Sequence, residues 1–382
     1  MARQADGTQP SIPVAGRRVR SDNQVVRDAL AVAVQVGHPV LLWGSPGEGK
    51  TRLVEQTAAA LGRRCEVVIG SVREATDIAG LPVRDGAGVT FVPPAWARRC
   101  VEHPASVVFF DELTTATPSV QAAMLRVVLD REVGDLRLPR EVSIVAAANP
   151  PEMSAGGDDL APPLANRFCH LDWEADAGAW VQGMLTGWTV GSPPEVPAGW
   201  KVTAVRWRAL LAAFIRARPS ILRELPAAVT NQGRAWPSPR SWDVAHELAA
   251  ASEAAGCPEA VTHALVAGTV GAGPAIEFLR FAAEADLPDP EELLADPSSV
   301  RADVRSDLLL AGLGGVVGAV AMRPTEARWE AAWEVLAAVC EANRADIAAL
   351  AADELLALRE PDWAPPASAL AFVDILREAA LL

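Results

Sequence analysis

The sequence has few of the residues that build disulfide frameworks or zinc sites, and it contains no tyrosine. Its five cysteines are odd in number and show no CxxC spacing, so we expect reduced thiols. Its five histidines form neither an HExxH motif nor a close pair, and no nucleophile–histidine–acid arrangement can be assembled from them. These absences exclude the common zinc-based and cysteine-based sites. The cysteines are Cys65, Cys100, Cys169, Cys257 and Cys340.

Lysine is almost absent, and no basic stripe runs along the chain. Two of the 34 basic residues are lysines, Lys50 and Lys201, and the net charge is −14. From residue 257 to the end, 21 acidic residues stand against 8 arginines. A chain without a basic surface has little means of neutralising a run of phosphates, so nucleic acid is not the expected partner. The acidic C-terminal third could face a basic protein, or it could be ordinary solvated surface.

Long hydrophobic runs are missing as well. The most apolar window, residues 308–322, spans 15 residues and is interrupted by glycines, which is too short for a membrane span. We expect a buried helix or helix pair there, and no membrane insertion. The first twenty residues lack the apolar core of a signal peptide, so we expect a cytoplasmic protein with a flexible N-terminal tail.

The chain does contain short apolar runs that alternate with helical periodicity. We expect strands at 39–43, 65–69, 107–110 and 142–147, and helices at 25–36, 51–62 and 119–130. This alternation predicts an α/β fold with a parallel sheet. A glycine turn within residues 76–94 predicts a β-hairpin.

Helical patterns dominate after residue 171. We expect helices at 207–218, 241–255, 261–285, 327–358 and 367–381. The sequence therefore predicts a tail over residues 1–20, an α/β domain over 21–171, a helical lid over 172–256 and an acidic helical C-terminal region over 257–382.

The segment from Gly44 to Thr51, GSPGEGKT, matches the phosphate-binding pattern G-x-x-x-x-G-K-[ST] in full. Its glycines allow backbone N–H groups to surround β- and γ-phosphates, and Lys50 adds a compact charge that arginine replaces poorly. The hydroxyl of Thr51 is expected on Mg²⁺. The residues expected to contact the nucleotide are Gly44, Pro46, Gly47, Glu48, Gly49, Lys50, Thr51 and Arg52.

Polar side chains follow the next two buried strands. Asp111 and Glu112 end the run VVFFDE, so we expect Asp111 to hold Mg²⁺ and Glu112 to polarise a water for attack on the γ-phosphate. Asn149 follows the strand VSIVAAA, where its amide could bind that water or the γ-phosphate. An Asn-Pro turn is the simpler alternative for Asn149.

With these motifs in place, the sequence resembles the AAA+ ATPases, and among them the MoxR-like and dynein-related branch. GSPGEGKT is similar to its Walker A motif, VVFFDE to its Walker B motif and AAANP to its sensor 1 strand. The resemblance covers roughly residues 20–255. It implies a P-loop NTPase fold of three αβα layers with a helical lid, and an ATP hydrolase with ATP and Mg²⁺ as ligands.

The resemblance also implies roles for two arginines. In LAPPLANRF, Arg167 takes the place of the branch's arginine finger, and in WPSPRSW, Arg240 takes that of the sensor 2 arginine. A finger at the domain edge reaches the nucleotide of the next subunit, so the active site needs a homo-oligomeric ring or a filament, and the resemblance favours a hexameric ring. Arg126 and Arg131 could reach a neighbouring subunit too, or serve on the surface.

The same resemblance implies roles for two hairpins and suggests a kind of partner protein. The hairpin within residues 77–94 is similar to the helix-2 insert that faces the central pore, and LDREVGDLRLPREV is similar to the pre-sensor 1 hairpin. Residues 278–297 resemble an extension of bacterial MoxR-like ATPases that pair with a von Willebrand factor A-type or metallopeptidase-like partner. An ordinary helix end with capping acids explains that segment equally well.

The expected function is remodelling or activation of a partner protein through ATP hydrolysis. An activase for a single enzyme, like the ATPases that release inhibitors from Rubisco, falls within the same branch. A nucleic-acid-linked NTPase of restriction or motor type is the alternative from another class. A scaffold that binds ATP without turnover is a third, although a water-polarising Glu112 counts against it.

Overall fold

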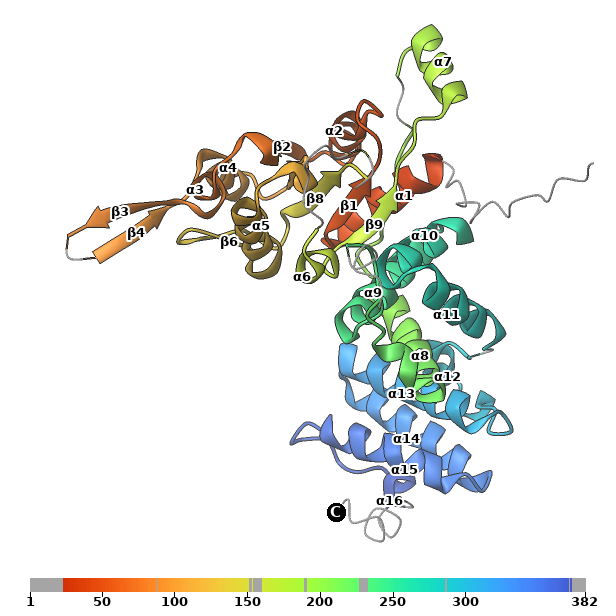
Figure 1. Ribbon diagram of the computed structural model, residues 1–382. Coiled ribbons are helices and arrows are strands. Elements are labelled where there is room, and N and C mark those ends of the chain that lie inside the picture. Colours follow the sequence, from red (N-terminus) through yellow and green to blue (C-terminus); the bar gives the residue numbers. More distant parts are fainter. Residues whose placement is uncertain are drawn as a thin grey trace, which may run out of the picture.

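The computed structural model describes residues 23–86, 88–150, 153, 160–188, 191–226, 233–285, 287–370 and 372. An α/β part with a five-stranded sheet leads into a stack of helices (Figure 1). The tail predicted over residues 1–20 lies outside the described residues, as does most of the helix predicted at 367–381.

The main sheet has the strand order β2-β5-β8-β1-β9, and every neighbouring pair is parallel. Parallel pairing brings the carboxyl ends of β1, β5 and β8 to one edge, where the polar residues that follow them meet. The fifth strand, β9, is absent from the predicted strands. In chain order the strands are β1 (Val40–Trp43), β2 (Arg64–Ile69), β5 (Ser106–Asp111), β8 (Ser143–Ala148) and β9 (Cys169–Asp172).

Helices cover both faces of this sheet and make three layers, as predicted. One apolar core joins alternate strand residues to α1 (Asn23–Val36) and α2 (Lys50–Ala60). The core on the other face contains residues of α3 (Ala75–Ala79), α4 (Ala95–Glu102), α5 (Pro118–Asp130) and α6 (Pro162–Ala165). Strands β1, β5 and β8 have apolar side chains on both faces and are almost wholly buried, which explains their continuous apolar runs, whereas the edge strand β2 is partly exposed.

Two antiparallel hairpins leave the α/β part. The longer one pairs β3 (Leu81–Asp85) with β4 (Gly88–Val92) and points away from the sheet (Figure 1). The shorter one pairs β6 (Glu132–Val133) with β7 (Leu136–Arg137). They touch where the Asp135 carboxylate accepts a hydrogen bond from the backbone N–H of Phe91 at 2.8 Å.

Beyond β9, every regular element of the described chain is a helix. An apolar core built from α8, α9, α10 and α11 is followed by a second built mainly from α12, α13, α14 and α15. The elements are α7 (Ala177–Thr186), α8 (Lys201–Ala217), α9 (Pro239–Ala254), α10 (Glu259–Val270), α11 (Ala272–Glu284), α12 (Pro290–Ala295), α13 (Ser306–Met322), α14 (Glu326–Glu341), α15 (Ala345–Ala357) and α16 (Ala367–Leu370), with single 3₁₀ turns at Gly70–Val72, Leu113–Thr115, Pro219–Leu222 and Pro297–Ser299.

The apolar window at 308–322 forms most of the single helix α13, which is buried between α8 and α15. Within the part of the chain that the structure describes, no helix has both the length and the apolar character needed to cross a bilayer.

Candidate functional site

The loop between β1 and α2 has the backbone of an anion site. Gly49, which caps α2, has a φ of 80°, in the left-handed region that favours glycine. Gly44 is packed so tightly that a Cβ there would lie 2.5 Å from the carbonyl oxygen of Trp173. The N–H groups of the first turn of α2 face the loop, and such a helix start favours a bound phosphate.

The ammonium group of Lys50 is enclosed by this loop, and the residue is 8% exposed. Its Nζ donates hydrogen bonds to the carbonyl oxygens of Gly44 at 2.6 Å and Ser45 at 3.0 Å, and to Oδ1 of Asn149 at 2.9 Å. Burial lowers the pKa of Lys50, while three nearby carboxylates act in the opposite direction. The three donors of Lys50 can turn to phosphate oxygens at the same place.

Thr51 and Asp111 bring two oxygens together beside Lys50. Thr51 lies in the first turn of α2, and its hydroxyl donates to Oδ2 of Asp111, the last residue of β5, at 2.7 Å. Hydroxyl and carboxylate oxygens are hard ligands, and Mg²⁺ is usually held by one or two protein oxygens together with waters and substrate phosphates. This pair therefore fits a magnesium ion that also contacts a nucleotide.

Glu112 follows Asp111 directly but has different partners. Its backbone lies in the left-handed region with a φ of 57°, and its N–H donates to Oδ1 of Asp111 at 2.9 Å. Its carboxylate accepts a hydrogen bond from the hydroxyl of Ser71, and the residue is exposed. The two neighbouring acids are thus separated, with one beside Thr51 and the other open to solvent.

Asn149 lies between the phosphate loop and the segment after β5. Its amide oxygen accepts from Lys50, and its backbone oxygen accepts from the hydroxyl of Thr114 at 3.4 Å. The structure thus brings together Lys50, Thr51, Asp111 and Asn149, four residues that the sequence places in three separate segments.

Two charged residues of the predicted nucleotide set direct their side chains elsewhere. The carboxylate of Glu48 accepts from the backbone N–H of Ala175 at 2.6 Å, so this bulky residue turns away from the loop interior. Arg52 is 71% exposed at its side chain and lies 3.5 Å from Glu55. Any contact between Arg52 and a phosphate in this arrangement comes from its backbone N–H.

Trp173 is a part of this site that the sequence prediction missed. Its indole N–H donates to the carbonyl oxygen of Glu48 at 2.7 Å, and the guanidinium of Arg27 lies 5.2 Å from its ring centre. The residue thus joins the end of β9 to the loop and to α1. The sequence did not single out Trp173, because it is one of twelve tryptophans spread along the chain and belongs to no motif.

In the described part of the chain, Arg167 and Arg240 have no hydrogen bond or ion pair with the four clustered residues. Arg167 donates to the carbonyl oxygen of Pro163, and its Nε is buried without a hydrogen-bond partner in the described part of the chain. Burial, and then the charge of Arg240, lowers the pKa of Arg167, while Asp130 raises it. Arg240 is an exposed residue in the first turn of α9.

A second unpredicted cluster links β1, β9 and the segment before α9. The guanidinium of Arg234 lies 4.2 Å from the ring centre of Trp43 and donates to the carboxylate of Asp172 at 2.8 Å. The indole N–H of Trp43 donates to Nδ1 of His170 at 2.8 Å, and Nε2 of His170 lies 2.8 Å from the carbonyl oxygen of Ala165. These partners fix the neutral tautomer of His170 with its hydrogen on Nε2.

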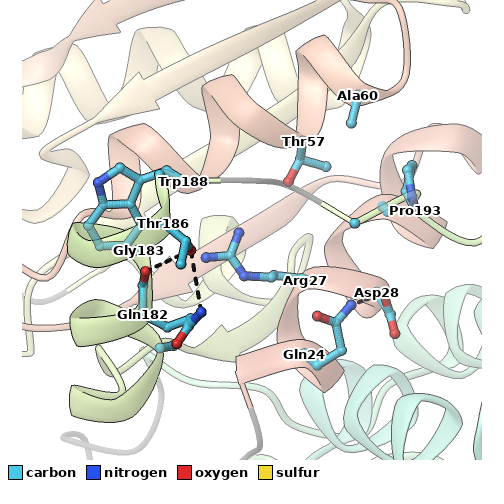
Figure 2. Close-up of a pocket in the computed structure, with 14 residues that line it drawn as sticks. Gln24, Arg27, Asp28, Thr57, Ala60, Gln182, Gly183, Thr186, Trp188 and Pro193 are labelled. Carbon is cyan, nitrogen blue, oxygen red and sulfur yellow. Dashed lines mark hydrogen bonds between the residues drawn. The ribbon is translucent and has the colours of Figure 1, made fainter.

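A cavity of about 250 Å³ lies between α1, α2 and α7. Figure 2 shows the Arg27 side chain extending into it, with Thr57 on one wall and Trp188 on another. Thr57 is seven residues beyond Lys50 on α2, which places it about 10 Å further along the helix axis. The cavity thus lies further along α2 than the phosphate loop.

Comparison with known proteins agrees with this geometry. Residues 39–168 match the model of the AAA domain, dynein-related subfamily. No curated protein matches the chain. A crystal structure from Cytophaga hutchinsonii, described as a presumed ATPase, is 15% identical and aligns with a TM-score of 0.40 over 65% of this chain and 83% of the other. The family match thus identifies residues 39–168 as an AAA domain of the dynein-related subfamily, and this domain agrees with the P-loop αβα fold and with ATP hydrolysis as its activity.

Proposed function

We propose that the chain is a Mg²⁺-dependent ATPase of MoxR-like type that assembles into a ring, with a hexamer as the favoured state, and remodels or activates a partner protein. The observation that carries this proposal is the meeting of Lys50, Thr51, Asp111 and Asn149 at one edge of the sheet. A lysine, a hydroxyl, a carboxylate and an amide gathered after three neighbouring strands match the parts that hold phosphate and Mg²⁺ in P-loop NTPases.

Each residue of the edge has a part in hydrolysis. Lys50 holds the phosphates, and Thr51 and Asp111 hold Mg²⁺, which when bound neutralises charge on the phosphate oxygens. Glu112, open to solvent, accepts a proton from the attacking water. Asn149 orients that water or the γ-phosphate. Its amide oxygen is hydrogen-bonded to Lys50, so the amide lies beside the group that holds the phosphates.

The cavity beside α2 suits the base and ribose of the nucleotide. It opens from the helix that begins at Lys50, and its lining combines apolar surface with the polar side chains of Gln24, Arg27 and Asp28. Most small-molecule sites have this mixture of apolar walls and a few polar groups.

Arg167 and Arg240 act, in this proposal, on the nucleotide of the adjacent subunit. Among the described residues, neither arginine is hydrogen-bonded to Lys50, Thr51, Asp111 or Asn149, and the charge of Arg240 acts on Arg167. Two cations held together away from their own phosphate loop can neutralise phosphates that a second copy of the chain presents. Such an arrangement needs a head-to-tail ring or filament, and the ring is the form we propose.

The hairpin β3–β4 is the element we propose to face the pore and the partner protein. It projects from the sheet (Figure 1), and five of its apolar residues are exposed: Leu81, Val83, Val89, Phe91 and Val92. The contact between Phe91 and Asp135 joins it to the shorter hairpin β6–β7, so movement of one is passed to the other. A von Willebrand factor A-type or metallopeptidase-like protein, in the cytoplasm, is the partner we propose.

Mixing two inactive variants tests the ring. Arg167→Ala removes the finger but leaves the chain's own site intact, and it should lower turnover by about 10³–10⁵-fold. Glu112→Gln removes the proton acceptor but keeps the arginines. Mixed oligomers should regain ATP hydrolysis, because intact arginines then meet intact sites. An Arg167→Ala protein that turns over ATP normally, or a mixture that stays inactive, contradicts the proposed ring.

A further inference from the structure

Asn166 joins the segment that carries Arg167 to the helix that carries Arg240. Its Nδ2 donates a hydrogen bond to the carbonyl oxygen of Trp236 at 2.9 Å, and its Oδ1 accepts one from the hydroxyl of Ser238 at 2.7 Å. The carbonyl oxygen of Trp236 can only accept, so the amide has one productive orientation. We call these two hydrogen bonds, from Asn166 to Trp236 and from Ser238 to Asn166, the joint.

Ser238 is both the partner of Asn166 and the N-cap of α9. It is buried, and its hydroxyl oxygen accepts from the backbone N–H of Ser241 at 3.1 Å while its hydrogen goes to Asn166. Arg240 follows two residues later in the first turn of α9. The same hydroxyl therefore fixes the start of the helix and connects it to Asn166.

Arg167 directly follows Asn166, so the joint sets the spacing of the two arginines. Like charges repel, so two guanidinium groups stay near each other more readily where the backbones that carry them are held. The hydrogen bonds of Asn166 hold the two backbones where the charge of Arg240 still acts on Arg167.

We propose that Asn166 is a positioning residue for ATP hydrolysis, which holds Arg240 beside Arg167 so that both guanidinium groups meet the neighbouring subunit's phosphates as one unit. The inference rests on the proposed function, in which these arginines act across a subunit boundary. Asn166 itself touches neither the nucleotide nor the reacting atoms.

Kinetics of two variants test the joint from both sides. Asn166→Ala and Ser238→Ala should each lower kcat on the order of 10²-fold, the size of effect that a displacement of about 1 Å can cause. The KM for ATP should change little, because each chain's own phosphate loop is untouched. The double variant should lose less than the product of the two single effects, because the two substitutions share the contact between Asn166 and Ser238.

Thr325→Ala is the matched control for loss of a helix cap. Thr325 caps α14, where its side chain accepts from the backbone N–H of Arg328 at 3.4 Å. It should leave kcat unchanged, since α14 carries no part of the proposed site. A Thr325→Ala protein that is as slow as Ser238→Ala would make the joint an ordinary structural contact and overturn the inference.

Mixing with Glu112→Gln chains separates the two proposals. Asn166→Ala chains keep their own phosphate loop, and Glu112→Gln chains supply correctly held arginines. Turnover per Asn166→Ala chain should therefore be at least tenfold higher in the mixture than in Asn166→Ala protein alone. If the mixture rescues Arg167→Ala but not Asn166→Ala, or if Asn166→Ala hydrolyses ATP normally, the present inference is overturned. If it does not rescue Arg167→Ala, the proposed function itself fails. Ser238→Ala gives a second, independent reading of the same mixture should Asn166→Ala not fold.

Discussion

The hydroxyl of Thr51 donates a hydrogen bond to Oδ2 of Asp111 at 2.7 Å. Thr51 lies in the helix that follows β1 and Asp111 ends β5, and β8 lies between these two strands in the sheet. The start of α2 and the end of β5 meet there because both lie at the carboxyl edge of one parallel sheet. A hydroxyl and a carboxylate at hydrogen-bond distance are already close enough to share a metal ion. This contact is the geometric basis for the magnesium site we propose.

Replacing Asp111 by Asn keeps the shape of this contact but removes its charge. We expect Asp111→Asn to lower the affinity for Mg²⁺ by at least about 100-fold, and turnover to become undetectable. Titration of ATP binding with and without Mg²⁺ checks this directly, because the variant should bind ATP equally in both conditions. If Mg²⁺ strengthens ATP binding by the variant as much as it does for the unaltered protein, Asp111 does not hold the metal.

Glu112→Gln should separate nucleotide binding from hydrolysis. Glutamine can still accept the hydrogen bond from Ser71, so the local backbone should hold, but it cannot take a proton from water. We expect turnover to fall by about 10²–10⁴-fold with ATP affinity retained. Steady-state hydrolysis and filter binding of labelled ATP measure the two effects. Ser71→Ala is the control for loss of the contact, and it should lower turnover much less. Normal hydrolysis by Glu112→Gln would refute the assignment of the proton acceptor.

The sequence was sufficient to predict the parallel sheet and the polar residues that follow its strands at the carboxyl edge. Strands with apolar residues on both faces, such as Val107–Phe110, appear as continuous apolar runs, and the structure confirms the parallel α/β fold that they predict. The phosphate loop was equally visible, because its glycines and Lys50 are required at fixed spacing.

Short or interrupted elements were harder to predict. The strand β9 has four residues with His170 among them, and its burial depends on hydrogen bonds to Trp43 and Ala165 that no local pattern shows. The helix predicted at 261–285 is two helices, because Gly271 adopts a φ of 89° between them. The helix predicted at 327–358 is broken in the same way near Asn343, whose φ is 61°.

The contacts around the two arginines could not be predicted for a different reason. Asn166 and Ser238 lie 72 residues apart, and Arg234 reaches Asp172 across 62 residues. Polar residues that pair over such distances carry no periodicity, so only the folded chain shows that they meet.

The buried His170 makes stability depend on pH in a defined window. Burial, with a smaller effect of Arg234, lowers the pKa of His170 to about 4 from its ordinary value of 6.5. Between these values the unfolded chain binds a proton that the folded chain does not, so the free energy of unfolding falls as pH falls, by up to roughly 1.4 kcal/mol per pH unit. Urea denaturation between about pH 7 and about pH 4 measures this slope.

His170→Gln is the comparison for the pH experiment. Glutamine does not titrate in this range, so the variant should lose less stability over the same interval, although it is less stable at neutral pH. His246, also buried with a lowered pKa, contributes in the same direction, so the slope should decrease without vanishing. An unchanged slope in His170→Gln would mean that His170 is not the group responsible.

Lys50→Arg tests why the phosphate loop keeps one of the chain's two lysines. The Nζ of Lys50 reaches three acceptors on different sides, including the carbonyl oxygens of Gly44 and Ser45, from a nearly buried position. A planar guanidinium is larger and directs its donors in one plane, so it cannot reproduce these contacts. We expect Lys50→Arg to weaken ATP binding by at least about tenfold, because a hydrogen bond to a charged group contributes about 1.5–3 kcal/mol. Lys201→Arg, at the exposed start of α8, should bind ATP normally in the same calorimetric titration. If Lys50→Arg binds ATP as tightly as the unaltered protein, the loop needs positive charge alone, and the geometric reason for lysine is wrong.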